Sequence, residues 1–146
     1  MALIARGLGV AREDIVAHAW CDNGPQWRGV MLRSAQQVLA LRPDSRLLTG
    51  LEVGVVGMQP AGQDTDFEVR AFFPGHNGPT EDPVTGSLNA ALAQWLMGAG
   101  LAPARYTAAQ GTVLGRAGRV YLERDADGAI WVGGDSVVCI QGQVTL

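Results

Sequence analysis

The chain has 146 residues, of which 47% are hydrophobic and 17% are charged, with 20 glycines and a formal net charge of −3. This composition is typical of one compact, turn-rich domain over residues 1–146, and it excludes a disordered or fibrous protein. The acidic balance predicts no nucleic-acid partner, and because no apolar run reaches the about 18 residues of a membrane span, no membrane segment is expected.

Other features of the sequence indicate the cellular compartment and exclude some kinds of site and reaction. The N-terminal apolar stretch is followed at once by Arg12, Glu13 and Asp14, which does not fit a secretory signal and makes the cytoplasm the expected location. All 11 basic residues are arginine, which excludes a Schiff-base lysine and with it pyridoxal phosphate chemistry. Cys21 and Cys139 stand far apart without metal-binding spacing, so we expect neither a disulfide framework nor a metal site.

The first half of the chain has the pattern of strands with one short helix. Runs of β-branched and aromatic residues predict strands, which cover residues 15–20, 27–33, 51–58 and 67–73. The first two are separated by a turn at Asn23-Gly24-Pro25. Ser34 followed by Gln37 has the spacing of a capping box and predicts a short helix that ends before Pro43.

The second half begins with a long polar loop, from Gly75 to Ser87, that opens onto the best-defined helix. The apolar residues of this helix recur at helical spacing: Leu88, Ala91, Leu92, Trp95, Leu96 and Ala99. Four short strands are expected after it, over 106–109, 119–124, 129–132 and 136–140, with a hairpin at Asp127-Gly128. This order predicts an α+β fold in which a curved, mostly antiparallel sheet wraps around a central helix.

The polar loop concentrates Glu81, Asp82, Thr85, Gly86 and Ser87 at the start of that helix. A helix N-terminus presents unpaired backbone N–H groups and a partial positive charge, so it can hold a carboxylate or phosphate without a lysine or arginine. Gly86 would let the backbone approach a ligand closely. The same residue types also serve plain helix capping, so capping and ligand binding both remain open from the residues alone.

The stretch FFPGHNGPTEDPVTGSLNAALAQWL resembles the signature of the PhzF-like (phenazine biosynthesis-like) isomerase family. The similarity continues through AAQGTVLGRAGRVYLE and IWVGGDSVVCIQGQV, and more faintly upstream through NGPQWRGVMLRSAQQVLALRPD. It covers the C-terminal half of the family pattern. The resemblance implies a diaminopimelate epimerase-like fold, in which two half-barrels meet at a cleft and this chain forms one of them.

The resemblance also implies roles for the loop residues. Asp82 and Ser87 would be catalytic, Asp82 by accepting or relaying a proton and Ser87 by hydrogen bonding to the substrate. Thr85, Gly86 and Glu81 would bind the substrate, a small carboxylate or amino-acid-like molecule. An acid in a turn close to a proline, such as Glu81, is also often structural. The family resemblance implies no cofactor and no metal.

One departure from the family pattern qualifies these roles. The principal proton-transferring glutamate of the family, and a Gly-His-Ala-Thr-like segment, belong to the other half. His76 is expected to be a solvated loop residue and His18 a packing residue. We therefore expect isomerisation by proton transfer only when a second half completes the cleft, either in a homodimer or by pairing with an N-terminal-half chain. A non-catalytic binding domain derived from such an enzyme, and a truncated gene product, are the alternatives.

Overall fold

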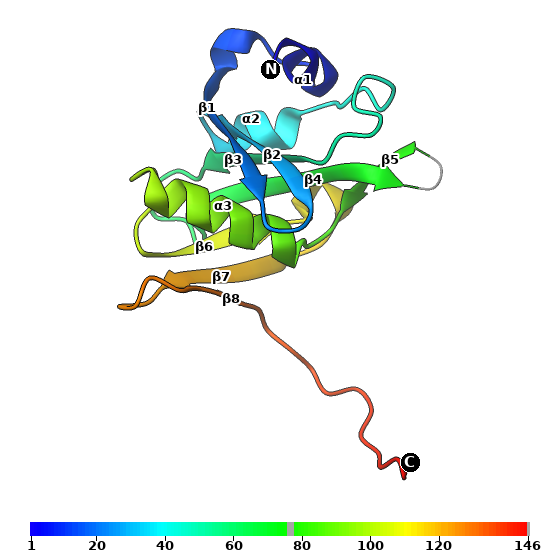
Figure 1. Cartoon of the computed structure of the whole chain (residues 1–146), viewed down its shortest axis with the longest axis vertical. Coiled ribbons are helices and arrows are strands. Elements are labelled where there is room, and N and C mark those ends of the chain that lie inside the picture. The colour runs from blue at the N-terminus through cyan, green and yellow to red at the C-terminus, as the bar shows by residue number, and fades with distance from the viewer. Residues whose placement is uncertain (76–77, 146) are drawn as a thin grey trace.

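The computed structural model describes residues 1–75 and 78–145, so His76 lies outside the described residues. Within these residues three α-helices and eight strands make up the fold (Figure 1), with two one-turn 3₁₀ helices at Arg12–Asp14 and Thr112–Leu114. The helices are α1 (Ala2–Leu8), α2 (Ala35–Ala40) and α3 (Gly86–Gly98). The strands are β1 (Ile15–Asp22), β2 (Gln26–Leu32), β3 (Val53–Met58), β4 (Phe67–Gly75), β5 (Gly78–Asp82), β6 (Arg105–Gln110), β7 (Gly118–Arg124) and β8 (Ile130–Gly133).

The strands form one eight-stranded sheet in the order β1-β2-β3-β4-β6-β7-β8, with β5 paired to β4. The β2–β3 and β4–β6 pairs are parallel, and the other described pairs are antiparallel. Helix α3 contacts β1 at one edge of the sheet and β7 and β8 at the other, so the sheet curves around it. This arrangement confirms the predicted α+β class and the half-barrel around a central helix.

The concave face of the sheet packs against α3. Strand β4 alternates Phe67, Val69 and Ala71 toward this helix, as the period of a strand requires. From its side, α3 buries an apolar face that includes Leu88, Leu92 and Leu96. Because this face is buried against the sheet, the apolar residues of α3 recur at regular helical spacing in the sequence.

The opposite face of the sheet is covered by α1 and α2. Its buried apolar cluster joins residues of α1 and α2 with inward-facing residues of the central strands, among them Leu8, Val38, Val30, Val55 and Phe72. Helix α1 was not predicted from the sequence. Because the central strands are covered on both faces, β3 is apolar along most of its length and carries no clear alternation.

Helix α2 begins where the spacing of Ser34 and Gln37 predicted, with Ser34 as its N-cap, although the Gln37 side chain accepts from the backbone N–H of Arg33 and not from that of Ser34. The backbone N–H of Gln37 donates to Ser34 Oγ at 3.3 Å. A Cβ atom placed on Gly57 of β3 would collide with the backbone carbonyl of Ser34. The start of α2 therefore lies directly on β3, at a point where only glycine leaves enough room.

Two predicted segments differ from the structure. Part of the expected polar loop is strand β5, which pairs with β4 from Ala71–Asp82 to Gly75–Gly78. The strand expected over 136–140 is wrong, because residues 134–145 carry no regular secondary structure and run away from the domain (Figure 1). A strand pattern in the sequence becomes a strand only when a neighbouring strand accepts its hydrogen bonds. Among the described helices, none is both long and apolar enough to cross a membrane.

Candidate functional site

The segment between β5 and α3 is a tight connection held by side chains from three elements. Strand β5 ends at Asp82, opposite Ala71 of β4, and α3 begins four residues later at Gly86. Thr85 is the N-cap residue of α3 and is buried. The extended backbone of Thr85 is what an N-cap position requires, yet its hydroxyl is used elsewhere.

Four side chains form a hydrogen-bonded network beneath this connection, which we name the Asp82 network: Asp82, Thr85, Asn89 and Gln110. The Thr85 hydroxyl donates to Asp82 Oδ2 at 2.6 Å and accepts from Gln110 Nε2 at 3.0 Å. Gln110 Oε1 accepts from the Thr85 backbone N–H at 3.1 Å and from Asn89 Nδ2 at 2.8 Å. Gln110 Nε2 also donates to the Asp82 carbonyl at 3.0 Å.

The Asp82 network fixes the connection because its members at the centre are buried and paired. Gln110 and Asn89 are almost completely inaccessible, and Asn89 Nδ2 also donates to the Thr85 carbonyl at 2.9 Å. Buried polar groups that are fully paired stabilise one conformation, whereas an unpaired one is costly. The network therefore orients the Asp82 carboxyl and sets the position at which α3 starts.

Because the Thr85 hydroxyl is engaged with Asp82, the first turn of α3 has no side-chain cap within the described structure. Gly86 is exposed, and a Cβ atom built on it would meet no atom within 4 Å. An uncapped helix N-terminus with an open approach can accept an anion on its backbone N–H groups. The Thr85 side chain therefore does not cap α3, so capping, one of the two roles that the sequence left open for the loop, does not apply to this residue.

Ser87 belongs to a second set of contacts, on the side of the β1–β2 turn. Its hydroxyl oxygen accepts from Trp27 Nε1 at 3.3 Å, and its carbonyl accepts from Asn23 Nδ2 at 2.8 Å. As an acceptor from Trp27, the hydroxyl of Ser87 still carries its own hydrogen for donation. Ser87 is half-buried, at the edge of the exposed Gly86.

Glu81 is the predicted site residue that the structure places elsewhere. Arg70 contacts both oxygens of its carboxylate, Nε to Oε1 at 2.8 Å and Nη2 to Oε2 at 2.7 Å. Successive side chains of a strand point to opposite faces, so Glu81 lies on the face covered by α2 while the Asp82 carboxyl turns toward Thr85. The substrate contact of Glu81 stays a prediction, and Glu81 has no part in the Asp82 network.

Four residues that support the loop were not predicted from the sequence: Asn23, Trp27, Asn89 and Gln110. Two of them carry a signal in the sequence. Asn89 is a polar residue on the apolar face of α3, and Gln110 follows Tyr106 and Ala108 at inward-facing positions of β6. A polar residue at a core-facing position needs a buried partner, which is a reason to look for a network.

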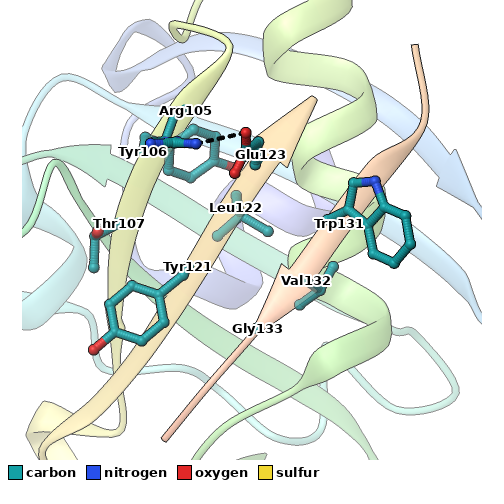
Figure 2. Close-up of a pocket in the computed structure, with 9 residues that line it drawn as sticks. All are labelled: Arg105, Tyr106, Thr107, Tyr121, Leu122, Glu123, Trp131, Val132 and Gly133. Atoms are coloured by element: carbon teal, nitrogen blue, oxygen red, sulfur yellow. Dashed lines mark hydrogen bonds and ion pairs between the residues drawn. The ribbon is translucent and has the colours of Figure 1, made fainter. Parts of the chain in front are cut away.

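A hollow of about 520 Å³ lies elsewhere, over strands β6, β7 and β8 (Figure 2). Its wall includes the Arg105–Glu123 ion pair, at 2.6 Å, together with Tyr121 and Trp131. It shares no residue with the Asp82 network. Among the described residues, no group of three or more His, Cys, Asp or Glu side chains is arranged to hold a metal ion.

The chain matches a known protein family. The sequence model of the family PhzC-PhzF, phenazine biosynthesis-like protein, matches residues 1–142. The chain is 31% identical over 133 residues to antisense-enhancing sequence 1 of Schizosaccharomyces pombe, covering 84% of this chain and 44% of that protein. It is 26% identical over 137 residues to the uncharacterized isomerase PM1503 of Pasteurella multocida, covering 94% of this chain and 47% of that protein. The chain thus spans about half the length of these curated relatives.

Solved structures show the same fold. The phenazine biosynthesis protein of the PhzF family from Bacillus anthracis superposes with a TM-score of 0.69 at 15% identity, over 88% of this chain and 49% of that one. The PhzF family protein of Enterococcus faecalis gives 0.67 at 24% identity, over 94% and 52%. The predicted epimerase PA4716 from Pseudomonas aeruginosa gives 0.60 at 24% identity, over 90% and 47%. At these identities the likeness establishes the fold alone.

Proposed function

Because the chain belongs to the phenazine biosynthesis-like (PhzC-PhzF) family, we propose that it forms one wall of an isomerase active site for a small carboxylate or amino-acid-like metabolite. The observation that carries the proposal is the uncapped start of α3 at Gly86, between an oriented carboxyl and a serine hydroxyl. Two relatives named as an isomerase and a predicted epimerase support the reaction class.

In this proposal the substrate carboxylate binds the backbone N–H groups at the first turn of α3. The partial positive charge of a helix N-terminus favours an anion there, and the open space beside Gly86 admits it to the backbone. The hydroxyl of Ser87, held by Trp27, donates a hydrogen bond to a second oxygen or to an amine of the substrate.

Asp82 moves the proton. Its Oδ2 atom is held by the Thr85 hydroxyl at 2.6 Å, which leaves Oδ1 to take a proton from one substrate carbon or return it to another. One C–H bond of the substrate breaks and another C–H bond forms, so the step needs no oxidant or reductant. A second group on the opposite side of the substrate completes the exchange, and a second subunit supplies it: another copy of this chain or an N-terminal-half chain.

Hydrogen exchange tests this function directly. The chain, alone and mixed with the N-terminal half of a full-length family member, is incubated in D₂O with a panel of small carboxylates and amino acids. Deuterium incorporation at carbon is then followed by NMR. We expect exchange with at least one compound, and a loss of about 10²- to 10⁴-fold in Asp82→Asn. Glu13→Gln, an exposed acid away from the loop, is the control and should keep the wild-type rate.

Two results would overturn the proposal: no exchange in either preparation, or exchange that Asp82→Asn leaves unchanged while the circular dichroism spectrum is also unchanged. A competing function as a non-catalytic interaction domain is favoured by a separate observation, the exposed apolar residues of the segment 134–145. That reading predicts that Asp82→Asn changes neither partner binding nor any activity of the complex.

A further inference from the structure

The C-terminal segment of residues 134–145 extends away from the domain with its apolar side chains in solvent (Figure 1). Val137, Val138, Ile140 and Val144 are each between 80% and 92% exposed. Isolated exposed apolar residues are ordinary, but a run of exposed branched residues in one short segment marks an interaction surface.

The residues of this segment have the pattern of a strand. Val138, Ile140 and Val144 recur at even spacing and would share one face of a strand, with Val137, Cys139, Gln141 and Gln143 on the other. From 136 to 145 there is no charged residue and no proline. Strands that remain at a free edge are usually protected by such residues, so this composition fits a strand that is paired in the working protein.

Contacts with β7 set the direction in which the C-terminal segment leaves the domain. Gly133 still pairs with Tyr121 of β7, and a Cβ atom on Gly134 would lie 3.6 Å from the carbonyl oxygen of Arg119. The Tyr121 hydroxyl then donates to Asp135 Oδ2 at 3.1 Å. Residues up to Asp135 therefore continue the direction of β8 along β7, and the chain passes the end of β7 instead of folding back on β8.

Strand β1 offers an acceptor edge. It stands at the opposite end of the sheet from β8, and within the described residues its only neighbouring strand is β2. Its eight residues, Ile15–Asp22, equal in number the stretch 136–143. Val16 and Trp20 are exposed on its outer face, and Ala17 and Ala19 are only partly covered on the face toward α3.

We infer that residues 136–143 of one copy add as a strand to the β1 edge of a second copy, and that the exchange is reciprocal in a two-fold symmetric dimer. A second copy is the occupant because one chain carries both the outward strand and an unpaired edge of the same length. Since the segment is uncharged from 136 to 145, two chains of net charge −3 meet there without like charges in contact. The inference rests on the proposed function only in requiring a second subunit.

The mass in solution tests the inference independently of turnover. Sedimentation equilibrium should give twice 15.4 kDa for the full chain and a monomer for a variant that ends at Asp135. A monomeric full chain, or a truncated variant that still dimerises, overturns it. Asp82→Asn should dimerise as the wild type does, so a failed isomerase proposal and a failed dimer are told apart.

A pair of point variants tests the same inference in the full-length chain, so the result does not depend on whether the truncated chain folds. Ile140→Lys should raise the dimer dissociation constant by roughly tenfold or more, because the lysine charge would have to be buried on the apolar face. Gln141→Lys, on the opposite face of the same exposed segment, should change it less than about twofold. Equal effects of the two variants would contradict the strand geometry.

Hydrogen exchange then locates the acceptor edge. On dilution from dimer to monomer, the amides of β1 (Ile15–Asp22) and of residues 136–143 should lose protection together. A dimer in which β1 exchanges at the same rate as in the monomer overturns β1 as the acceptor. A monomeric chain that captures an N-terminal-half chain through residues 136–143 overturns the second copy as the occupant.

Discussion

Arg70 of β4 contacts Glu81 of β5 through two parallel hydrogen bonds, of 2.8 and 2.7 Å, on the face of the sheet that α2 covers. The Arg70 side chain is 4% exposed and that of Glu81 14%. The same guanidinium donates through Nη1 to the carbonyls of Val38 and Leu41 at 3.1 and 3.0 Å. One arginine thus ties the strand that leads into the candidate site to the C-terminal end of α2.

Glu81→Gln should destabilise the protein by about 3–5 kcal/mol, because it removes one charge of a buried pair and leaves the Arg70 guanidinium uncompensated. The free energy of unfolding in urea measures the loss. Glu123→Gln is the matched control, since its partner Arg105 is 75% exposed and Glu123 itself 46%. Exposed pairs contribute at most about 1 kcal/mol, so a similar loss in both variants would contradict the structural role of Glu81.

Gln110→Leu should cost about 1–3 kcal/mol in stability, because it leaves the backbone N–H of Thr85 and the side-chain amide of Asn89 without their buried acceptor. Urea denaturation provides the measurement. Gln63→Leu, in the exposed loop between β3 and β4, should change the free energy of unfolding by less than about 0.5 kcal/mol. Equal stability of the two variants would mean that the Asp82 network does not hold the loop.

Because of Glu68, the free energy of unfolding should decrease as the pH rises. Its side chain is buried, and within the described structure its Oε1 atom has no hydrogen-bond partner. Burial raises the pKa of this carboxyl, and Thr112 and the nearby arginines offset the rise only in part. The folded state therefore binds the proton more tightly than the unfolded state, so this contribution is fully present below the usual pKa of a glutamate and is lost as the pH rises through the raised pKa.

The variant Glu68→Gln tests this linkage. Its urea midpoint should depend less on pH than that of the wild type above the usual pKa of a glutamate, and should lie higher at neutral pH, since no charge is then buried. Glu52→Gln, an acid in a more accessible position, serves for comparison. A wild-type midpoint that rises steadily with pH over this range, with no difference from Glu68→Gln, would rule the linkage out.

Gly57→Ala should destabilise the domain by about 1–3 kcal/mol, because its Cβ would meet the backbone of Ser34 and push α2 off the sheet. The midpoint of thermal unfolding, together with the urea curve, gives the size of the effect. Gly98→Ala has open space around it and lies at the end of α3, so it should be neutral or stabilise by up to about 1 kcal/mol. Two neutral variants would contradict the close packing of α2 on β3.

The two cysteines should differ in reactivity. Burial raises the pKa of the Cys21 thiol, which is also shielded against α3, whereas Cys139 is exposed in the C-terminal segment. With a thiol-specific chromogenic reagent at pH 8, and at a dilution at which the chain is a monomer, the wild type should show one fast-reacting group, and Cys139→Ser should show none until urea is added. A fast reaction that persists in Cys139→Ser would place Cys21 at the surface.

The amino-acid sequence by itself determined most elements of the fold, because alternation and helical spacing are properties of neighbouring residues. Strand alternation in 67–73, the capping spacing of Ser34 and Gln37, and the apolar face of α3 each specify a local structure that the core then buries. The motif EDPVTGS likewise placed the candidate site at the start of α3, since residues close in sequence cannot lie far apart.

Only the tertiary structure decided which side chains meet. Glu81 and Asp82 are adjacent in the sequence, yet the pleat of β5 turns one to Arg70 and the other to Thr85. Gln110 reaches the loop because β6 lies parallel to β4, which no local pattern specifies. Residues 136–140 carry a strand pattern without becoming a strand in this chain, because strand hydrogen bonds require a partner and the domain offers none where the segment leaves it.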